Sequence, residues 1–282
     1  MYEMPEPQIY VDTRISAYKN YLTTEKAKSL CDAANTAGVL ARFVLDLTLQ
    51  WRTVSYTASM PALLVESLGT FSEGYMASVS PNGGILQFAE VVLAKLSRRI
   101  PALVDDRQLR SQFATELVTL AHEFHSAKSN VTQNIDHDAI WNDYLKLAPF
   151  AMSVWSSQRV AFVTFYNAYE SFLVRCVKQV TGVGKIRTTS KEFKRALREN
   201  FSVDIMSPCW TNHDLNIARL VRHSLSHANG CPTNELNGQR HNIKLIDDVL
   251  QITPDDNHAL LGVLSRAVET LISQAARLPQ FS

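Results

Sequence analysis

The sequence predicts an all-α fold, in which a helical N-terminal region precedes a helical bundle with a small β-hairpin insertion. The chain has only ten glycines and ten prolines among its 282 residues, and long stretches contain neither. Apolar residues recur at helical spacing, as in Leu30, Ala34, Val39, Phe43 and Leu47. Apolar residues make up 46% of the chain and charged residues 20%, which are typical values for a globular protein with a substantial core.

The first half of the chain has four segments with a helical pattern. We expect these helices at 23–51, 61–79, 84–99 and 105–128. Residues 80–84, Ser-Pro-Asn-Gly-Gly, predict a turn. The polar stretch 129–137 predicts a loop between two domains, an N-terminal helical domain at 1–147 and a second helical domain at 148–282.

The second half should contain a long helix, a short helix, a third helix with a polar motif, a hairpin and a closing helix. The long helix begins near Pro149, because proline suits the first turn of a helix. Two apolar-rich arms flank Asp247 and Asp248, and this pattern predicts a hairpin turn. The expected boundaries are, in order, 149–181, 191–200, a helix ending at 228, 243–252, and a helix from about 254.

The third of these helices, which we call the motif helix, has start and stop signals. Thr211 is expected to cap its start, with Asp214 in the capping-box position. Gly230 and Pro232 mark its end.

The motif helix has one polar and one apolar face when residues are placed about 100° apart. The apolar face carries Ile217, Ala218, Leu220, Val221 and Leu225. The polar face carries Arg219, Arg222, His223, Ser226 and His227. Imidazole moves protons near neutral pH, and the guanidinium fork fits phosphate oxygens. Phosphoryl transfer on RNA needs both functions.

This face carries a resemblance to a known family. Arg222-x4-His227, with the polar His223 directly after the arginine, resembles the Arg-x4-6-His signature of the HEPN superfamily (higher eukaryotes and prokaryotes nucleotide-binding domains). The second position of that signature is usually Asn, Asp or His. The segment 165–173, Phe-Tyr-Asn-Ala-Tyr-Glu-Ser-Phe-Leu, is similar to an early HEPN helix with an aromatic-x-Glu-Ser-Phe pattern. The resemblance covers roughly residues 150–278.

The resemblance implies a metal-independent endoribonuclease without a cofactor, active as a homodimer in which two motifs meet across a twofold axis. His227 would act as general base or acid, Arg222 would hold the scissile phosphate, and His223 would orient the pair or touch phosphate. Helix geometry adds Arg219 and Ser226 to the same face. The resemblance further suggests a cytoplasmic bacterial toxin or anti-phage effector that acts on RNA. Its N-terminal domain would then restrain the nuclease, sense a signal or recruit a regulatory partner.

Glu170 lies in an otherwise apolar and aromatic stretch. If it is buried it needs a partner, and an arginine of the motif helix is the natural candidate. A structural ion pair and a residue that organises the site both predict this contact. Tyr166, Tyr169 and Phe172 are expected in the core rather than stacked on nucleotides.

The net charge of +1 conceals an asymmetry between the two halves of the chain. Residues 1–150 carry 13 basic against 16 acidic side chains, whereas residues 151–282 carry 15 against 11. The basic side chains concentrate at Lys185, Arg187, Lys191, Lys194, Arg195 and Arg198. Such a segment either binds RNA electrostatically or forms a solvated helix face, and the first five residues are our candidate RNA contacts.

The sequence gives little support for a membrane span, a signal peptide, disulfide bonds or a metal site. No apolar run reaches the roughly 18 residues needed to cross a bilayer, and the acidic, proline-bearing start is unlike a signal peptide. The four cysteines show no paired spacing, which is typical of reduced thiols in the cytosol. His122 and His125 are three residues apart, but no further ligands complete a metal site.

Two alternatives to the nuclease stay open. The first is an inactive HEPN-like module whose polar face binds a nucleotide or a partner protein. The second is a structural helical protein that dimerises and in which the motif is a fortuitous surface cluster.

Overall fold

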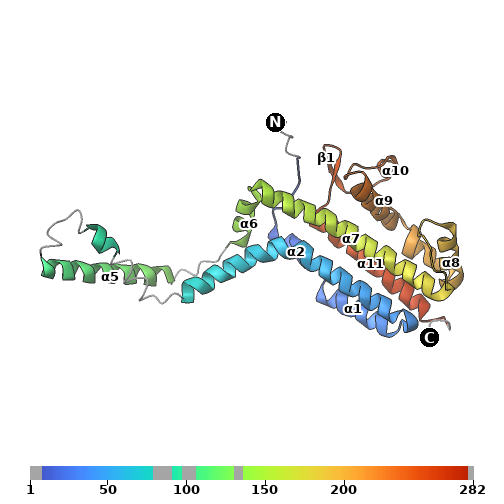
Figure 1. The fold of residues 1–282 in the computed structure, drawn as a ribbon, viewed down its shortest axis with the longest axis horizontal. Coiled ribbons are helices and arrows are strands. Elements are labelled where there is room, and N and C mark those ends of the chain that lie inside the picture. Colours follow the sequence, from blue (N-terminus) through green and yellow to red (C-terminus); the bar gives the residue numbers. More distant parts are fainter. Residues whose placement is uncertain (1–7, 79–90, 97–105, 130–135, 279–282) are drawn as a thin grey trace. The chain divides into compact units, whose positions relative to one another are not determined.

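The computed structural model describes residues 8–78, 91–96, 106–129 and 136–278. These residues are mostly helical, with one antiparallel hairpin, so the predicted all-α class with a small hairpin is confirmed (Figure 1). The chain divides into two compact units: residues 1–63 with 138–282, and residues 64–137. This division does not coincide with the boundary that we expected at 147/148.

The first expected helix, 23–51, is wrong in its extent. Helix α1 (Thr24–Asn35) ends early, and a short 3₁₀ turn (Gly38–Leu40) separates it from α2 (Ala41–Ser78). Gly38 has a φ of +52°, a left-handed conformation that breaks the helix at little cost for glycine.

Helix α2 also runs through Pro61 instead of beginning there. Proline removes one backbone donor from the helical ladder. The helix nevertheless continues, since Ala58, Ala62 and Val65 bury one continuous face on both sides of the proline. Tertiary burial thus outweighs the local signal.

The second unit contains the end of α2, the helical residues 91–96 and α5 (Arg107–Ser129). The side chain of Asp106 caps α5 by accepting from the backbone N–H groups of Gln108 at 2.9 Å and Leu109 at 3.0 Å. The helix expected at 105–128 is therefore confirmed with a start two residues later. The rest of the helix expected at 84–99, the turn at 80–84 and most of the loop at 129–137 lie outside the described residues.

The helices of the second half follow the sequence patterns closely. After α6 (His137–Leu145), which we did not predict, α7 (Ala148–Thr181) has Pro149 in its first turn and ends at Gly182 with a φ of +68°. Helix α8 (Lys191–Phe201) is capped by the hydroxyl of Ser190. Helix α11 (Pro254–Ala275) has a capping box between Thr253 and Asp256.

The predicted hairpin is present as β1 (Lys244–Ile246) and β2 (Val249–Gln251), with Leu245 opposite Leu250. Asp247 and Asp248 both have positive φ, at 48° and 59°. Two successive left-handed residues form the tight turn that matches the twist of a hairpin.

The core of the first unit forms around α7 and α11, which pack on each other (Figure 1). Helix α1 packs on α11, whereas α8 and the motif helix, α9 (His213–His227), pack on α7. The indole N–H of Trp51 donates to the carbonyl of Phe165 at 3.0 Å, which joins the first part of α2 to α7. Tyr166, Tyr169 and Phe172 are buried in this core, so their expected placement is confirmed.

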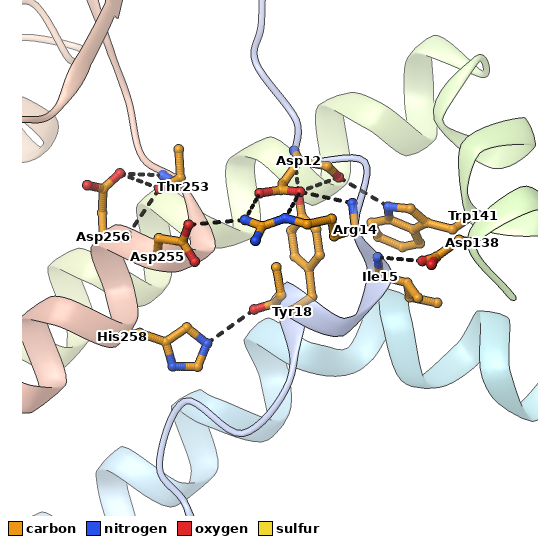
Figure 2. Close-up of polar contacts among 11 residues, drawn as sticks. Asp12, Arg14, Ile15, Tyr18, Asp138, Trp141, Thr253, Asp255, Asp256 and His258 are labelled. Carbon is orange, nitrogen blue, oxygen red and sulfur yellow. Dashed lines mark hydrogen bonds and ion pairs between the residues drawn. The ribbon is translucent and has the colours of Figure 1, made fainter.

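Polar contacts attach the N-terminal segment to the second half of the chain (Figure 2). The indole of Trp141 in α6 donates to the carbonyl of Asp12 at 3.2 Å, and the backbone N–H of Ile15 donates to Asp138 at 3.1 Å. Arg14 pairs with Asp12 and reaches Asp255 of α11. These contacts are one reason why residues 1–63 group with the C-terminal helices. Within the described residues, no helix is long and apolar enough to span a membrane.

Candidate active site on the motif helix

The start of α9 differs by one residue from the prediction. The side chain of Asn212, rather than Thr211, caps the helix by accepting from the N–H of Leu215 at 2.8 Å. The hydroxyl of Thr211 donates instead to the carbonyl of Met206 at 3.0 Å, because residues 207–211 form a π-helical turn. The hydroxyl of Thr211 thus has its hydrogen-bond partner within that turn and does not cap α9.

The predicted end of α9 at Gly230 is confirmed. The N–H groups of Ala228 and Gly230 both donate to the carbonyl of Ser224, at 3.0 and 2.9 Å. Gly230 has a φ of +89°, and a Cβ at this position would overlap the guanidinium of Arg159. Because the helix ends here, His227 lies in its last turn.

The two faces of α9 lie as predicted. Ala218, Leu220 and Val221 are buried, and Ile217 and Leu225 are partly buried. On the polar face, Arg219 and Arg222 are half-buried, whereas His223, Ser226 and His227 are exposed. The helix therefore presents two accessible imidazoles beside two partly covered guanidinium groups.

The guanidinium of Arg222 pairs with the carboxylate of Glu170 on α7. Only 18% of the Arg222 side chain and 19% of the Glu170 side chain are exposed. The guanidinium also lies 5.5 Å from the ring centre of Tyr166, in a cation–π arrangement. The expected contact between Glu170 and an arginine of the motif helix is thus present.

The second oxygen of the Glu170 carboxylate accepts from the hydroxyl of Thr188, in the loop that leads to α8. One carboxylate therefore joins the motif helix to the basic segment. Neither the role of Thr188 nor this connection follows from the sequence pattern, since a loop threonine carries no distinctive signal.

The imidazoles of His223 and His227 are neighbours on successive turns of α9. Their ring centres are 4.9 Å apart and their planes are inclined by 49°. Because both side chains are exposed, a ligand can reach both rings from solvent.

Arg219 and Tyr166 form the inner border of this face. The guanidinium of Arg219 donates to Asn216 on the same helix and lies 5.8 Å from the ring centre of Trp210. Burial raises the pKa of Tyr166 far above its usual range; the charge of Glu170 adds to the rise, and Arg219 and Arg222 oppose it. The phenol of Tyr166 consequently keeps its proton.

The candidate RNA contacts lie on one exposed segment but do not all line one groove. Lys185, Arg187 and Arg195 line a cavity of about 520 Å³ between the loop and α8, together with Glu192 and Glu199. Lys191 and Lys194 are exposed outside it. The two glutamates partly offset the positive charge of this groove.

Arg159 on α7 is a site residue that our sequence reasoning missed. Its guanidinium stacks 4.4 Å from the ring centre of Trp155 and donates to the carbonyl of Asn229 at 2.9 Å. Burial lowers its pKa. Arg159, Ser226 and Asn229 line a cavity of about 310 Å³ beside the end of α9. The four-residue spacing of Trp155 and Arg159 is visible in the sequence, but their contact with Asn229 is not.

No group of three or more His, Cys, Asp or Glu side chains in the described ranges is arranged to hold a metal. His122 is exposed, and the side chain of His125 lies outside the described residues. Comparisons with protein-family models, curated proteins and solved structures give no match to this chain.

Proposed function

We propose that the chain is a metal-independent endoribonuclease whose active site is the polar face of α9. The observation that supports this most is the exposed pair His223 and His227, whose ring centres are 4.9 Å apart, on the same polar face as Arg222, whose guanidinium is paired with Glu170. Two neighbouring imidazoles and a fixed positive charge are the groups that cleavage of a ribose–phosphate backbone requires.

In the proposed reaction, the ribose 2′-hydroxyl attacks the adjacent phosphorus atom. His227 accepts the proton of the 2′-hydroxyl as the O2′–P bond forms. The P–O5′ bond breaks, and a protonated imidazole, from His223 or from His227 of a second copy, donates a proton to O5′. The products are a 2′,3′-cyclic phosphate and a 5′-hydroxyl, and no electron is gained or lost.

Arg222 would stabilise the negative charge that accumulates on the phosphate oxygens. Its contact with Glu170 limits the rotamers of the guanidinium, and the half-buried Arg219 lies on the same face. One face supplies few catalytic groups, so we propose a homodimer in which two copies of the face surround one phosphate. The basic segment that begins at Lys185 would guide the RNA strand.

A second candidate is an HEPN-like module that binds a nucleotide or protein without cleaving RNA. The pairing of Arg222 with Glu170 favours it, because the carboxylate already offsets the charge of the guanidinium and most of the side chain is covered. This module would bind RNA or nucleotide without forming cleavage products.

Incubation of the purified chain with mixed RNA in EDTA separates the two candidates. The nuclease requires cleavage that falls about 10²–10⁴-fold in His227→Gln, since a positioned proton carrier contributes a factor of that size. His122→Gln changes an exposed histidine in the other unit and should cleave like the wild type. RNA binding without products supports the module, and cleavage that persists equally in His227→Gln contradicts the proposal.

The resemblance leads us to propose a biological role as a toxin or anti-phage effector under the control of the N-terminal region. Induced expression in bacteria should arrest growth, and the same level of His227→Gln should not. Equal growth of cells with either protein argues against a toxin.

A further inference from the structure

A cavity of the first unit lies beside the first half of α9, away from the histidine pair. It has a volume of about 690 Å³, within the range of small-molecule sites. Its walls come from α7, the first half of α9, the loop 240–243 and α11. Arg222, His223 and His227 are not among its lining residues, so it is separate from the proposed active site.

One wall of this cavity is apolar. Phe162 of α7, Ile217 of α9 and Val263 of α11 line it, and Leu260 adds to the same side. A flat aromatic or aliphatic group is the kind of ligand body that such a wall accommodates.

Two arginines, Arg240 and Arg266, line the cavity as well. Neither forms an ion pair with a carboxylate in the described part of the chain. One terminal nitrogen of Arg266 lies 3.6 Å from the point where a Cβ on Gly262 would stand. The guanidinium thus folds back along α11 over the glycine that also lines the cavity.

The imidazole of His241, which also lines the cavity, has a ring nitrogen that is available to a ligand. Nδ1 of His241 is buried and has no hydrogen-bond partner among the described residues. The other two imidazoles of the cavity are engaged: Nε2 of His213 donates to the carbonyl of Arg240 at 3.0 Å, and Nε2 of His258 donates to that of Ala17 at 3.2 Å (Figure 2). A buried polar atom without a partner suggests a missing ligand or water.

The two carboxylates of the cavity do not pair with its arginines. Asp256 accepts from the backbone N–H of Thr253 at 2.8 Å and from its hydroxyl at 2.6 Å, and burial raises the pKa of Asp256 (Figure 2). Asp214 lies in the first turn of α9, where the helix dipole favours a negative charge. Both arginines are therefore available to an anion.

From these features we infer that this cavity binds an organic phosphate monoester with an apolar or aromatic body. The body lies against Phe162 and Val263, and the phosphate accepts hydrogen bonds from Arg240 and Arg266. Guanidinium groups bind phosphate oxygens strongly, and the apolar wall distinguishes this ligand from inorganic phosphate. The inference does not depend on RNA cleavage.

Isothermal titration calorimetry of the full chain with 1-naphthyl phosphate tests the inference, with 1-naphthol and inorganic phosphate as the two partial ligands. The phosphate ester should bind at least about tenfold more tightly than either partial ligand, because only the ester uses both walls. Absence of binding by the ester overturns the inference, as does equal affinity for naphthol, which would indicate an unspecific apolar groove.

Two variants test whether the phosphate ester binds in this cavity. Arg266→Met should weaken binding of the ester about tenfold, whereas Arg277→Met, which changes an exposed arginine outside the cavity, should not. Gly262→Leu fills the cavity and keeps the helix, since leucine forms helices better than glycine. Unchanged affinity in both Arg266→Met and Gly262→Leu contradicts the inference.

Discussion

Glu170 and Arg222 form an ion pair between α7 and α9 in which about four-fifths of each side chain is shielded from solvent, with 19% and 18% exposed. The same carboxylate also accepts from Thr188. Glu170, on the long helix α7, therefore contacts both the motif helix and the basic segment.

Glu170→Gln should lower the free energy of unfolding by about 1–3 kcal/mol, because it leaves the half-buried guanidinium of Arg222 without its counter-charge. Urea denaturation followed by circular dichroism measures the change. Glu199→Gln is the matched control, since Glu199 is 64% exposed and 3.9 Å from Arg195, and it should cost less than about 0.5 kcal/mol. Equal free energies of unfolding in the two variants would contradict a stabilising role of the Glu170–Arg222 ion pair.

Gly230→Ala should destabilise the end of α9 by about 1–3 kcal/mol, because alanine at a φ of +89° is strained and its Cβ overlaps Arg159. The control is Gly184→Ala, whose Cβ would meet no atom within 4 Å. Thermal unfolding of both variants checks this prediction. A Tm of Gly230→Ala at or above that of Gly184→Ala contradicts the placement of the helix end.

The N-terminal segment should contribute a pH-dependent stability through Asp12. The side chain of Arg14 donates to Asp12 and lowers the pKa of this carboxyl below its ordinary value of 3.8. A lowered pKa stabilises the folded chain above the unfolded value, and this contribution disappears as the pH falls through the folded pKa. Asp12→Asn should thus cost about 1–3 kcal/mol at pH 7 and progressively less below about pH 4.

Unfolding curves of wild type and Asp12→Asn at a series of pH values measure this difference. Asp46→Asn is a suitable control, because Asp46 pairs with Arg175 but is 50% exposed. A gap between wild type and Asp12→Asn that stays constant from pH 7 to the acid limit would exclude a role of the carboxylate charge.

Local signals made much of the second half predictable. Pro149 and Gly182 delimit α7, and Asp247 and Asp248 adopt the left-handed turn that their short polar side chains tolerate. The break at Gly38 was missed because a single glycine is also tolerated inside helices. Its positive φ of 52° is a property of the folded chain that the local sequence does not specify.

Contacts between residues far apart in sequence explain what was not predictable. Arg14 and Asp255 are 241 positions apart, and no periodicity indicates that they meet. At the site, the pairing of Glu170 with an arginine of the motif helix could be predicted, because a carboxylate among apolar neighbours needs a counter-charge; that arginine is Arg222. The contacts of Thr188 and Arg159 could not be predicted, because a loop hydroxyl and an isolated helical arginine have the same sequence pattern as ordinary surface residues.

The chemistry of the cleaved ends tests the central claim most directly. An RNA oligonucleotide is incubated with the chain in EDTA, and the product termini are identified by mass spectrometry, with a single 2′-deoxy substitution at the cleaved linkage as comparison. The proposal predicts a 2′,3′-cyclic phosphate and a 5′-hydroxyl from the RNA, and no cut at the substituted linkage. Intact RNA, or cleavage at the 2′-deoxy position, contradicts a nuclease built on His227 and Arg222.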